Sequence, residues 1–252
     1  MGLKTLLLST LAASAVQASQ IFRNTGTTSG WTGQVLEHKG RIQEVTNIAY
    51  EGSTGLKFEQ TYDPSYSGRY HSELYTADGY QRGDDRFYGF MFRLQGDWQF
   101  EHGQSYDLAQ FIGNFGANSC DQWSPTTMVY LRGSRLYTRI VTGDLCNRKF
   151  QTIDTGVDVV GGKWNKVILQ VRWRDNNEGQ FKIWVNGAKR YEVYNVPTTL
   201  SNTDVTFQFR VGLYANGWYD DGGMKGTQPF RQVWYDEIAI GTTFADVDPD
   251  QW

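Results

Sequence analysis

Three separated segments of the chain offer side chains that can bind an acidic ligand and move protons. His71 lies between Arg69 and Glu73 at intervals of two residues, so in a strand all three share one face. Tyr214 lies in another alternating segment, and Gln110 lies in an otherwise apolar run. Tyrosine and histidine can donate or accept a proton, while arginine and amide groups donate hydrogen bonds to carboxylates. This set of residues indicates chemistry on an acidic substrate.

A wider set of polar side chains shares the predicted faces of these segments. Tyrosine rings offer flat surfaces to sugar rings, and arginine pairs with carboxylates. Tyr219 is also an alternative to Tyr214 as the tyrosine that transfers a proton. We expect the following residues to bind substrate: Glu73, Tyr130, Arg132, Tyr137, Arg139, Gln208, Arg210 and Tyr219.

Each of these assignments has a structural alternative. A row of Arg, His and Glu can be a solvated charge ladder, and a buried glutamine such as Gln110 can simply hold a loop. An outward strand face with Tyr and Thr can reflect strand propensity alone. Both interpretations stay open for Gln110, and we adopt the functional one for His71 and Tyr214.

Alternating patterns predict that strands position these side chains. Residues 205–217 sort with a period of two into an unbroken apolar row and a polar row that contains Tyr214. Asn186-Gly187 and residues 132–135 indicate hairpin turns, residues 79–86 indicate a charged turn, and no segment has clear helical periodicity. Many short strands predict an all-β fold, a two-sheet antiparallel sandwich of the jelly-roll type. The strand-like segments are residues 21–48 (one edge strand with loops), 55–62, 69–75, 87–94, 106–115, 128–131, 136–141, 164–173, 180–185, 205–217 and 233–240.

The composition and the first residues indicate one exported, β-rich domain. The 252 residues include 28 Gly, 15 Tyr and 9 Trp, which favours sheets and turns over helices. Residues 1–18 combine one lysine, an apolar run and a small-residue cleavage pattern, as a secretory signal peptide does. We therefore expect a secreted, extracellular protein whose single domain spans residues 19–252.

Charge and hydropathy argue against two classes of partner. The formal net charge is −3 and no block of Lys and Arg occurs, so nucleic acid is not an expected partner. No segment after the first 18 residues has the length of a membrane-spanning helix. We expect a monomer that binds an acidic polysaccharide.

Cys120 and Cys146 are the two cysteines of the chain. In an exported protein a disulfide between them is the expected state, and nothing in the sequence pairs either one with a histidine as a catalytic thiol. By the chain-entropy estimate, such a disulfide contributes roughly 3 kcal/mol to the free energy of unfolding.

Three segments resemble those of secreted jelly-roll polysaccharide lyases. They are GKWNKVILQVRWRDNNEGQFKIWVNG, FRVGLYANG and VWYDEIAIG, and the resemblance extends from about Trp31 to the C-terminus. The chain resembles the glucuronan lyases of fungi most clearly, and alginate lyases and heparin lyase I more distantly. The resemblance implies a jelly-roll fold with a concave substrate groove.

The resemblance also implies roles for individual residues. In alginate lyases of this fold a Lys-x-Gly-x-Tyr pattern carries the catalytic tyrosine, and Arg210–Tyr214 is similar to it, so Tyr214 takes that role. Their Arg-x-Glu strand resembles His71–Glu73, and their Gln-x-His strand resembles Gln110–Ile112. Ile112 stands where those lyases have a basic histidine, so the identity of the base stays open.

The implied reaction is β-elimination. Gln110 and Arg69 would neutralise the carboxylate next to the C5 proton and so stabilise the enolate-like intermediate. A base then removes H5 and an acid protonates O4. In glucuronate H5 and O4 lie on the same side of the ring, so Tyr214 alone can serve both steps. His71 then acts as the base itself or as the group that lowers the pKa of Tyr214.

We therefore expect an endo-acting lyase for β-1,4-linked polyglucuronate. The alternatives are an alginate or heparin-type lyase of the same fold and a non-catalytic, lectin-like carbohydrate-binding module. A retaining glycoside hydrolase needs two carboxylates about 5 Å apart. The sequence has no Glu-x-Asp-x-Glu strand, and the adjacent Asp236 and Glu237 would point to opposite faces of a strand.

The resemblance further implies a structural Ca²⁺ away from the groove. Related sandwiches bind this ion through an aspartate on the last strand, which here is Asp236. Backbone carbonyls near Gly52 would complete the oxygen ligands that Ca²⁺ prefers. No His or Cys spacing indicates zinc, and no catalytic cofactor is expected.

Overall fold

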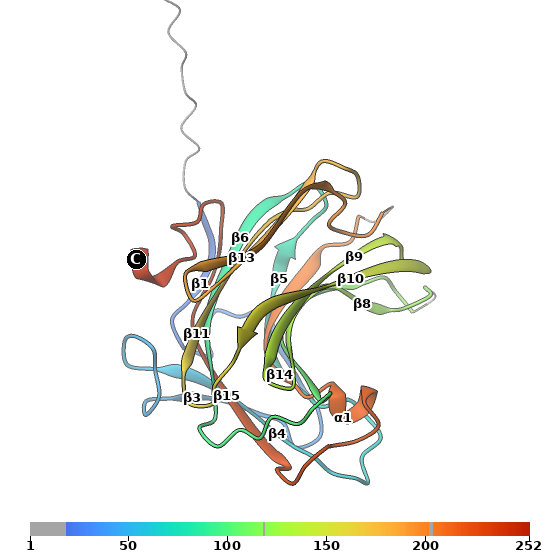
Figure 1. The fold of residues 1–252 in the computed structure, drawn as a ribbon. Helices are drawn as coiled ribbons and strands as arrows, with labels where there is room; N and C mark the ends of the chain where they lie inside the picture. Colours follow the sequence, from blue (N-terminus) through green and yellow to red (C-terminus); the bar gives the residue numbers. More distant parts are fainter. Residues whose placement is uncertain (1–18, 118, 202–203) are drawn as a thin grey trace, which may run out of the picture.

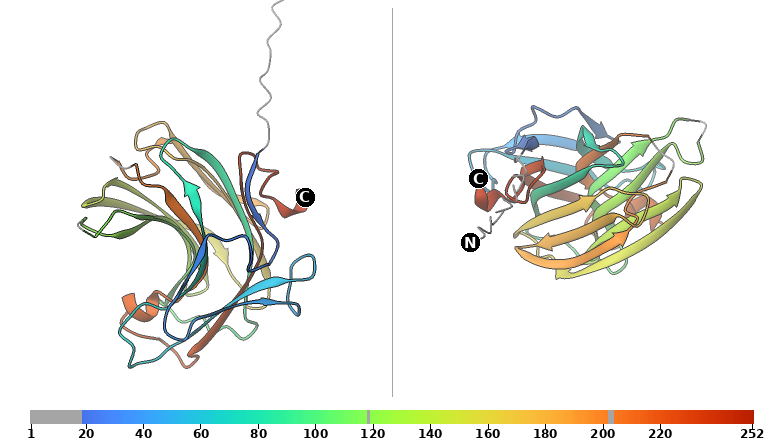
Figure 2. Two further views of the ribbon diagram at one scale, coloured as in Figure 1. Left: turned by 180° about the vertical axis from the view of Figure 1, so that it is seen from behind. Right: turned by 90° about the horizontal axis from the view of Figure 1, so that it is seen from above.

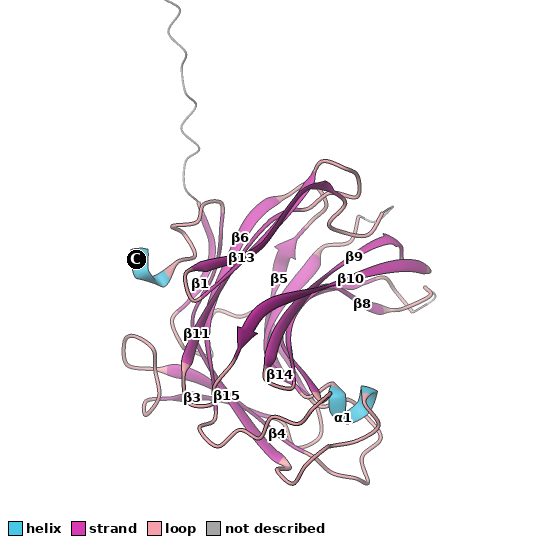
Figure 3. Cartoon of the chain, viewed as in Figure 1, coloured by secondary structure: helices cyan, strands magenta, loops and turns pink. Residues whose placement is uncertain are grey.

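The computed structural model describes residues 19–117, 119–201 and 204–252. In these residues fifteen strands form two antiparallel sheets that pack face to face (Figures 1 and 3). The predicted all-β jelly-roll sandwich is therefore confirmed. The predicted signal peptide, residues 1–18, lies outside the described residues. Within the described ranges no helix is long and apolar enough to cross a membrane.

One sheet, here called the back sheet, carries no part of the predicted site except Asp236. Its strands are β1 (Gln20–Asn24), β3 (Arg41–Val45), β4 (Gly55–Thr61), β6 (Asp85–Leu94), β11 (Trp164–Arg172), β12 (Gly179–Val185), β13 (Ala188–Val196) and β15 (Phe230–Gly241). Their order is β13-β12-β11-β6-β15-β4-β3, and β1 pairs with the C-terminal part of β15, beyond the residues that pair with β4.

The other sheet, here called the groove sheet, is strongly curved. Its strands are β2 (Gly33–Leu36), β5 (His71–Tyr80), β7 (Ser105–Asn114), β8 (Trp123–Arg132), β9 (Arg135–Asp144), β10 (Asn147–Asp158) and β14 (Phe207–Tyr214). Their order is β10-β9-β8-β7-β14-β5-β2. Its concave face opens between β8–β10 and the short helix α1 (Gly217–Asp220) in Figure 1, and Figure 2 shows the same curvature from behind.

The apolar row of β14 faces the core, as its alternation predicts. Phe207, Phe209, Val211 and Leu213 are fully buried between the sheets. Aromatic rings fill much of this space, and Tyr80 stacks on Trp173 with ring centroids 3.6 Å apart. The opposite face of β14 carries Arg210 and Tyr214 onto the concave surface. The core therefore fixes which side chains of β14 reach the groove.

The predicted charged turn at residues 79–86 is wrong in its extent. β5 continues to Tyr80 and β6 begins at Asp85, so only residues 81–84 form the turn. Gly79 suggested a turn, but it lies within β5. Glycine is needed there because a side chain would meet the backbone of the neighbouring strand. A Cβ at this position would lie 2.5 Å from the backbone nitrogen of Phe209.

Other strand boundaries also differ from the predicted ones, mainly where the sequence has no clear alternation of apolar and polar residues. Residues 20–45 contain three short strands instead of one, and α1 forms a single turn of helix that the sequence did not indicate. The edge strands β10 and β13 place few residues against the core, Ile153 and Val157 in the first and Tyr191 and Val193 in the second, and their regularity depends on pairing with a neighbour. The turn at Asn186-Gly187 is confirmed, with φ of 52° and 79° at its two residues.

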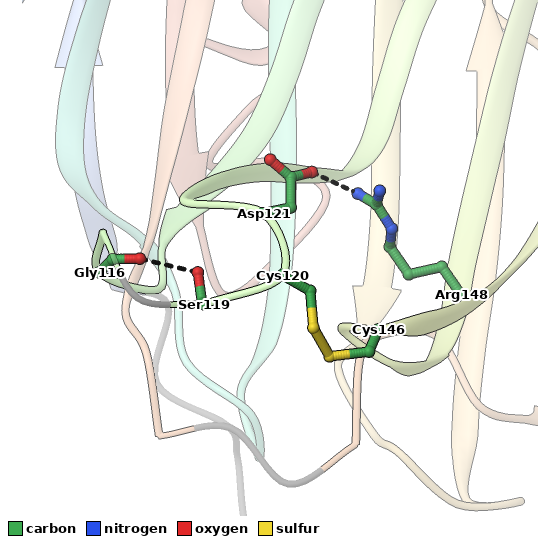
Figure 4. Close-up of a disulfide and its surroundings, with 6 residues drawn as sticks. All are labelled: Gly116, Ser119, Cys120, Asp121, Cys146 and Arg148. Atoms are coloured by element: carbon green, nitrogen blue, oxygen red, sulfur yellow. Dashed lines mark hydrogen bonds and ion pairs between the residues drawn. A yellow bond between two sulfur atoms is a disulfide. The ribbon is translucent and has the colours of Figure 1, made fainter.

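The structure contains the predicted disulfide between Cys120 and Cys146 (Figure 4). It connects the loop between β7 and β8 to the turn between β9 and β10. Next to it, Asp121 Oδ2 accepts a hydrogen bond of 2.7 Å from Arg148 Nη1. This loop leads into Trp123, which lines the concave face. The disulfide therefore holds one rim of the groove in place.

We predict that replacing both cysteines by serine lowers the free energy of unfolding by about 3 kcal/mol, because the unfolded chain regains loop entropy. Urea unfolding under non-reducing conditions measures this difference. Wild-type protein unfolded in the presence of a reductant is the control and should match the double variant. Equal midpoints for oxidised wild type and the variant would contradict the prediction.

Candidate active site

A groove of about 870 Å³ lies on the concave face of the groove sheet. Strands β5, β7, β8, β9 and β14 form its floor, and the loops beside β2, β7 and α1 form its rims. The predicted site residues that line it are Arg69, His71, Gln110, Tyr130, Arg132, Arg139, Arg210 and Tyr214. The fold thus brings residues from distant parts of the chain into one cavity.

Strand register arranges the floor of the groove in two cross-strand rows. Directly paired residues lie about 5 Å apart at Cβ, so their side chains touch or nearly touch. The first row runs through His71, Tyr214, Asp107, Tyr130 and Tyr137. The second row runs through Tyr75, Arg210, Gln110, Met128 and Arg139.

Tyr214 lies between an imidazole ring and a guanidinium group. Its ring stacks on His71 with centroids 3.7 Å apart and planes 18° apart. Arg69 Nη1 donates a hydrogen bond to the Tyr214 hydroxyl and also lies 3.3 Å from Asp220 Oδ1. Burial raises the pKa of Tyr214, and the positive charge of Arg69 opposes that shift. Tyr214 is therefore protonated at neutral pH and can act as an acid.

Glu73 is a buried carboxylate that binds three of the predicted site residues. Its Oε2 lies 2.6 Å from His71 Nδ1, and its Oε1 accepts a 2.7 Å hydrogen bond from Gln110 Nε2. Arg210 Nη1 lies 3.7 Å from Oε2. Burial acts to raise the pKa of Glu73, but His71, Arg210 and Gln110 together hold it below its usual value.

The ionised state of Glu73 decides the tautomer of His71. An ionised carboxylate only accepts hydrogen bonds, so His71 Nδ1 carries the hydrogen that it donates to Glu73. In a neutral imidazole the lone pair then resides on Nε2. Glu73 therefore leaves Nε2 of His71 as the proton acceptor, on a ring that stacks on Tyr214.

Gly212 provides the close strand approach that this arrangement requires. It pairs with Glu73 across β14 and β5, and its φ of 149° is unfavourable for other residues. A Cβ at this position would lie 2.2 Å from the carbonyl oxygen of Ser72 and 2.8 Å from Glu73 Cα. A side chain here would push β5 away from β14 at the position of Glu73.

The predicted substrate-binding residues occupy different places. Arg210 lies between the rings of Tyr75 and Trp123, with its guanidinium carbon 5.6 and 5.2 Å from their centroids. Gln208 does not line the groove, and its Oε1 accepts a 2.9 Å hydrogen bond from Arg210 Nε. Glu73 also does not line the groove, because its oxygens contact His71, Gln110 and Arg210 beneath the surface. Glu73 therefore supports groove residues from beneath, and Gln208 holds the Arg210 side chain from the same strand.

The tyrosines expected to bind sugar are also separated. Tyr130 lines the groove and stacks on Tyr137, with centroids 5.7 Å apart. Tyr137 lines a second cavity of about 570 Å³ that shares Arg132 with the groove. Tyr219 is half exposed outside the groove, and the guanidinium carbon of Arg69 lies 4.6 Å from its ring centroid. Its place outside the groove favours Tyr214 as the reacting tyrosine.

Several groove residues were not identified from the sequence, and Asp107 is the most buried of them. A bulge between Asp107 and Ala109 shifts the register of β7, so Asp107 and Gln110 face the same cavity although their numbers differ by three. Strict alternation would place them on opposite faces. A lone carboxyl group in an apolar strand was the available sequence signal. Asn216, Asp220 and Asp221 reach the groove from α1 and its flanking residues.

Of the predicted calcium residues, Asp236 lies in the back sheet and Gly52 in the loop between β3 and β4, and neither lines the groove. Asp236 Oδ2 accepts hydrogen bonds from the backbone nitrogens of Tyr50 (2.8 Å) and Glu51 (3.3 Å). Gly52 follows in the same exposed loop. Among the described residues no group of three or more His, Cys, Asp or Glu side chains has a metal-binding arrangement. A cation here would therefore depend on backbone carbonyl ligands.

The sequence predicts that the side chains of Asp236 and Glu237 point to opposite faces of a regular strand. The backbone of β15 is irregular at these two residues, so that argument does not apply. A register shift between Asp236 and Ala239 interrupts the alternation of β15, and Glu237 has a φ of 48°. Burial and the neighbouring Asp236 raise the pKa of Glu237 to about 7. Its Oε2 has no hydrogen-bond partner among the described residues. Because this pair lies outside the groove, it does not supply the carboxylates of a hydrolase there.

Residues 23–239 match the protein family described as Polysaccharide lyase. Since the match covers most of the sequence, this chain belongs to the polysaccharide lyase family and is an enzyme of that class. The resemblance identified from its motifs is therefore confirmed.

Solved structures refine the comparison. The chain is 52% identical to the endo-beta-1,4-glucuronan lyase from the fungus Trichoderma reesei, with a TM-score of 0.89, and the match covers 93% of this chain and 100% of that one. The alginate lyase from Aplysia kurodai is 12% identical with a TM-score of 0.57, and the match covers 88% and 98% of the two chains. At that identity the second match shows a shared fold alone. A search among curated proteins found no match.

We predict that Glu73→Gln lowers the kcat for polysaccharide cleavage by about 10²-fold, because His71 and Gln110 lose their common anchor and shift from their working positions. Steady-state kinetics of the purified variant measure this loss. Glu59→Gln is the matched control, because Glu59 is also buried but pairs with Lys57 in the back sheet. A kcat for Glu73→Gln equal to that of the control would contradict the anchoring role.

The same variant should change how stability depends on pH. Because the folded state lowers the pKa of Glu73, its ionised form stabilises the fold at neutral pH. That contribution is lost progressively as the pH falls below about 4.3, the usual glutamate value. Glu73→Gln should therefore lose less stability on acidification than the wild type.

Proposed function

We propose that this enzyme is an endo-acting lyase that cleaves β-1,4-linked polyglucuronate by β-elimination and leaves unsaturated uronate ends. The observation that carries the proposal is the stacked pair of His71 and Tyr214 on the groove floor, with Arg69 on the tyrosine hydroxyl. The 52% identity to a glucuronan lyase over its whole chain supports the same substrate.

His71 acts as the base and Tyr214 as the acid. Nε2 of His71 carries the lone pair and removes H5, while the protonated hydroxyl of Tyr214 gives its proton to O4. The raised pKa of Tyr214 suits an acid better than a base. The two rings stack face to face in the groove, so both can approach the same side of a glucuronate ring, where H5 and O4 lie.

Gln110 and Arg69 neutralise the substrate carboxylate. Removal of H5 moves negative charge onto the carboxylate, so donors aimed at its oxygens lower the barrier. Glu73 fixes the Gln110 amide through one hydrogen bond and leaves the second N–H free to donate to substrate. Arg69 is exposed at the groove edge, and its positive charge stabilises the negative charge that develops on the substrate carboxylate.

The extended groove suits attack within a polymer. Tyr130 and Arg132 continue the floor beyond the reacting pair, and Arg132 also borders the second cavity. A chain of uronate units can thus lie along both cavities, with its carboxylates near Arg132, Arg139 and Arg210. The enzyme acts outside the cell as a monomer, a location supported by residues 1–18 and by the disulfide.

A structural Ca²⁺ would bind beside Asp236 and the carbonyls of the Glu51–Gly52 loop. Glu237 follows Asp236, and its buried Oε2 accepts no hydrogen bond from the described residues and has only a 3.9 Å ion pair with Arg23, which supports an oxygen-rich cation site there. The ion would supply charge balance and rigidity to this edge of the back sheet and would take no part in elimination. Added Ca²⁺ should raise the melting temperature of chelator-treated wild type and leave that of Asp236→Asn unchanged; equal responses would contradict this site.

The decisive test of function is ultraviolet absorbance while the purified enzyme acts on glucuronan, alginate and heparin separately. Elimination forms a C4–C5 double bond conjugated with the carboxylate, so absorbance should rise with glucuronan. A rise with alginate or heparin alone would keep the reaction and change the substrate. No rise, with or without new reducing ends, would contradict the proposed lyase.

Variants of the stacked pair should separate the two roles. On glucuronan, Tyr214→Phe and His71→Ala should each lower kcat by about 10²- to 10⁴-fold, the usual contribution of general acid or base catalysis. On a glucuronide with a good aryl leaving group at O4, Tyr214→Phe should recover most of its activity, because that group leaves without a proton. His71→Ala should stay slow. Recovery by His71→Ala instead would reverse the assignments.

A further inference from the structure

Asp107 is a buried carboxyl group in the groove that the chemistry described above does not use. It lies on β7 between Tyr214 of β14 and Tyr130 of β8, in the row that contains the reacting pair. Its side chain lines the groove although the residue is only 3% exposed. Its Oδ2 atom has no hydrogen-bond partner among the described residues.

This lack of a partner distinguishes Asp107 from other acidic residues at the groove. Asp221 Oδ2 accepts hydrogen bonds of 3.0 Å from both the backbone nitrogen and the hydroxyl of Ser105. Both oxygens of Glu73 also have partners. Arg139 faces the same part of the groove but donates to the carbonyl oxygen of Pro125 at 3.2 Å. Asp107 is thus available to a ligand.

The charges around Asp107 favour its neutral form. Burial is the largest influence and raises its pKa well above the usual range, and the negative charges of Glu73 and Asp220 act in the same direction. The positive charges of Arg139 and Arg69 oppose this shift. Its cross-strand neighbours Tyr214 and Tyr130 are uncharged hydroxyl side chains at neutral pH. A buried carboxyl group without a partner avoids the large cost of an unpaired charge by keeping its proton.

We propose that Asp107, as a carboxylic acid, donates a hydrogen bond to the carboxylate of the uronate unit at the reacting position. This inference rests on the proposed function and adds a third donor to Gln110 and Arg69. An O–H donor to a carboxylate forms a short, strong hydrogen bond. Its place next to Tyr214 puts the donor beside the sugar ring that loses H5.

The role of Asp107 follows from where charge develops. Loss of H5 spreads negative charge onto the substrate carboxylate, which then accepts the Asp107 hydrogen bond more strongly. The proton is shared between the two carboxyl groups in the intermediate and remains on Asp107 once the double bond forms. No bond to Asp107 is made or broken over the cycle. An ionised Asp107 would instead repel the uronate.

Asp107→Asn and Asp107→Ala test the proposal through kcat and KM for glucuronan across pH. Asparagine keeps an uncharged donor, so this variant should stay within a few-fold of wild type at neutral pH. It should also lack the rise in KM that the wild type shows once the pH exceeds the raised pKa of Asp107. Alanine should lower kcat/KM by about 10- to 100-fold, the usual effect of losing a hydrogen bond to a charged group. Asp144→Asn, at the exposed end of β9, is the surface control.

Two kinetic results would overturn the proposal. If Asp107→Asn is as slow as Asp107→Ala at neutral pH, the enzyme needs an ionised or reactive carboxyl group at this position. If both variants match the wild type, Asp107 does not contact the substrate.

A measurement without turnover separates this inference from the proposed function. Between about pH 3.9, the usual aspartate value, and its raised folded-state pKa, Asp107 binds a proton only in the folded protein, so wild-type stability falls as pH rises. Asp107→Asn should remove that fall. The melting temperature of the variant minus that of the wild type should therefore increase from acidic to neutral pH. Parallel melting curves would show that Asp107 is ionised and contradict the inference.

If no polyuronate gives an unsaturated product, the proposed function fails while Asp107 is still tested by binding. Calorimetry with glucuronate oligomers in the Tyr214→Phe background should show weaker binding for Asp107→Ala than for Asp107→Asn. Equal affinities would overturn the inference by themselves.

Discussion

The geometry of the active site depends on the buried carboxylate of Glu73. It contacts His71, Gln110 and Arg210, which come from three adjacent strands of the groove sheet. An ion in this environment is stable only with such partners, and its partners lose their orientation without it. The same contact fixes the tautomer of His71 and orients the Gln110 amide. One buried charge therefore couples the fold of the sheet to the chemistry on its surface.

Two backbone features place that carboxylate and its neighbours. Gly212 lets β14 approach β5 closely beside Glu73. The bulge in β7 turns both Asp107 and Gln110 toward the groove. The core-facing aromatic and aliphatic residues of β14 hold the strand on the opposite side, so Tyr214 and Arg210 cannot turn inward. Catalytic geometry here is a consequence of strand register more than of loop conformation.

Much of the fold was predictable because an alternation of apolar and polar residues indicates a strand with one buried face. The apolar row from Phe207 to Leu213 and the hairpin at Asn186-Gly187 illustrate this. The main catalytic candidates followed from the same parity, since His71 and Tyr214 fall on polar faces. Asp107 was not predictable, because a bulge breaks parity without a clear sequence mark. Edge strands such as β10 were missed because pairing, not their own pattern, makes them regular. The support role of Glu73 required the three-dimensional contacts.

The chemical structure of the polysaccharide ends that cleavage creates tests the central claim most directly. Proton NMR and mass spectrometry of the products from glucuronan distinguish elimination from hydrolysis at each cleaved bond. The account predicts one saturated reducing end and one ring that has a C4–C5 double bond and no H5. Two saturated ends that both keep H5, with one water molecule added for each cleavage, would contradict it.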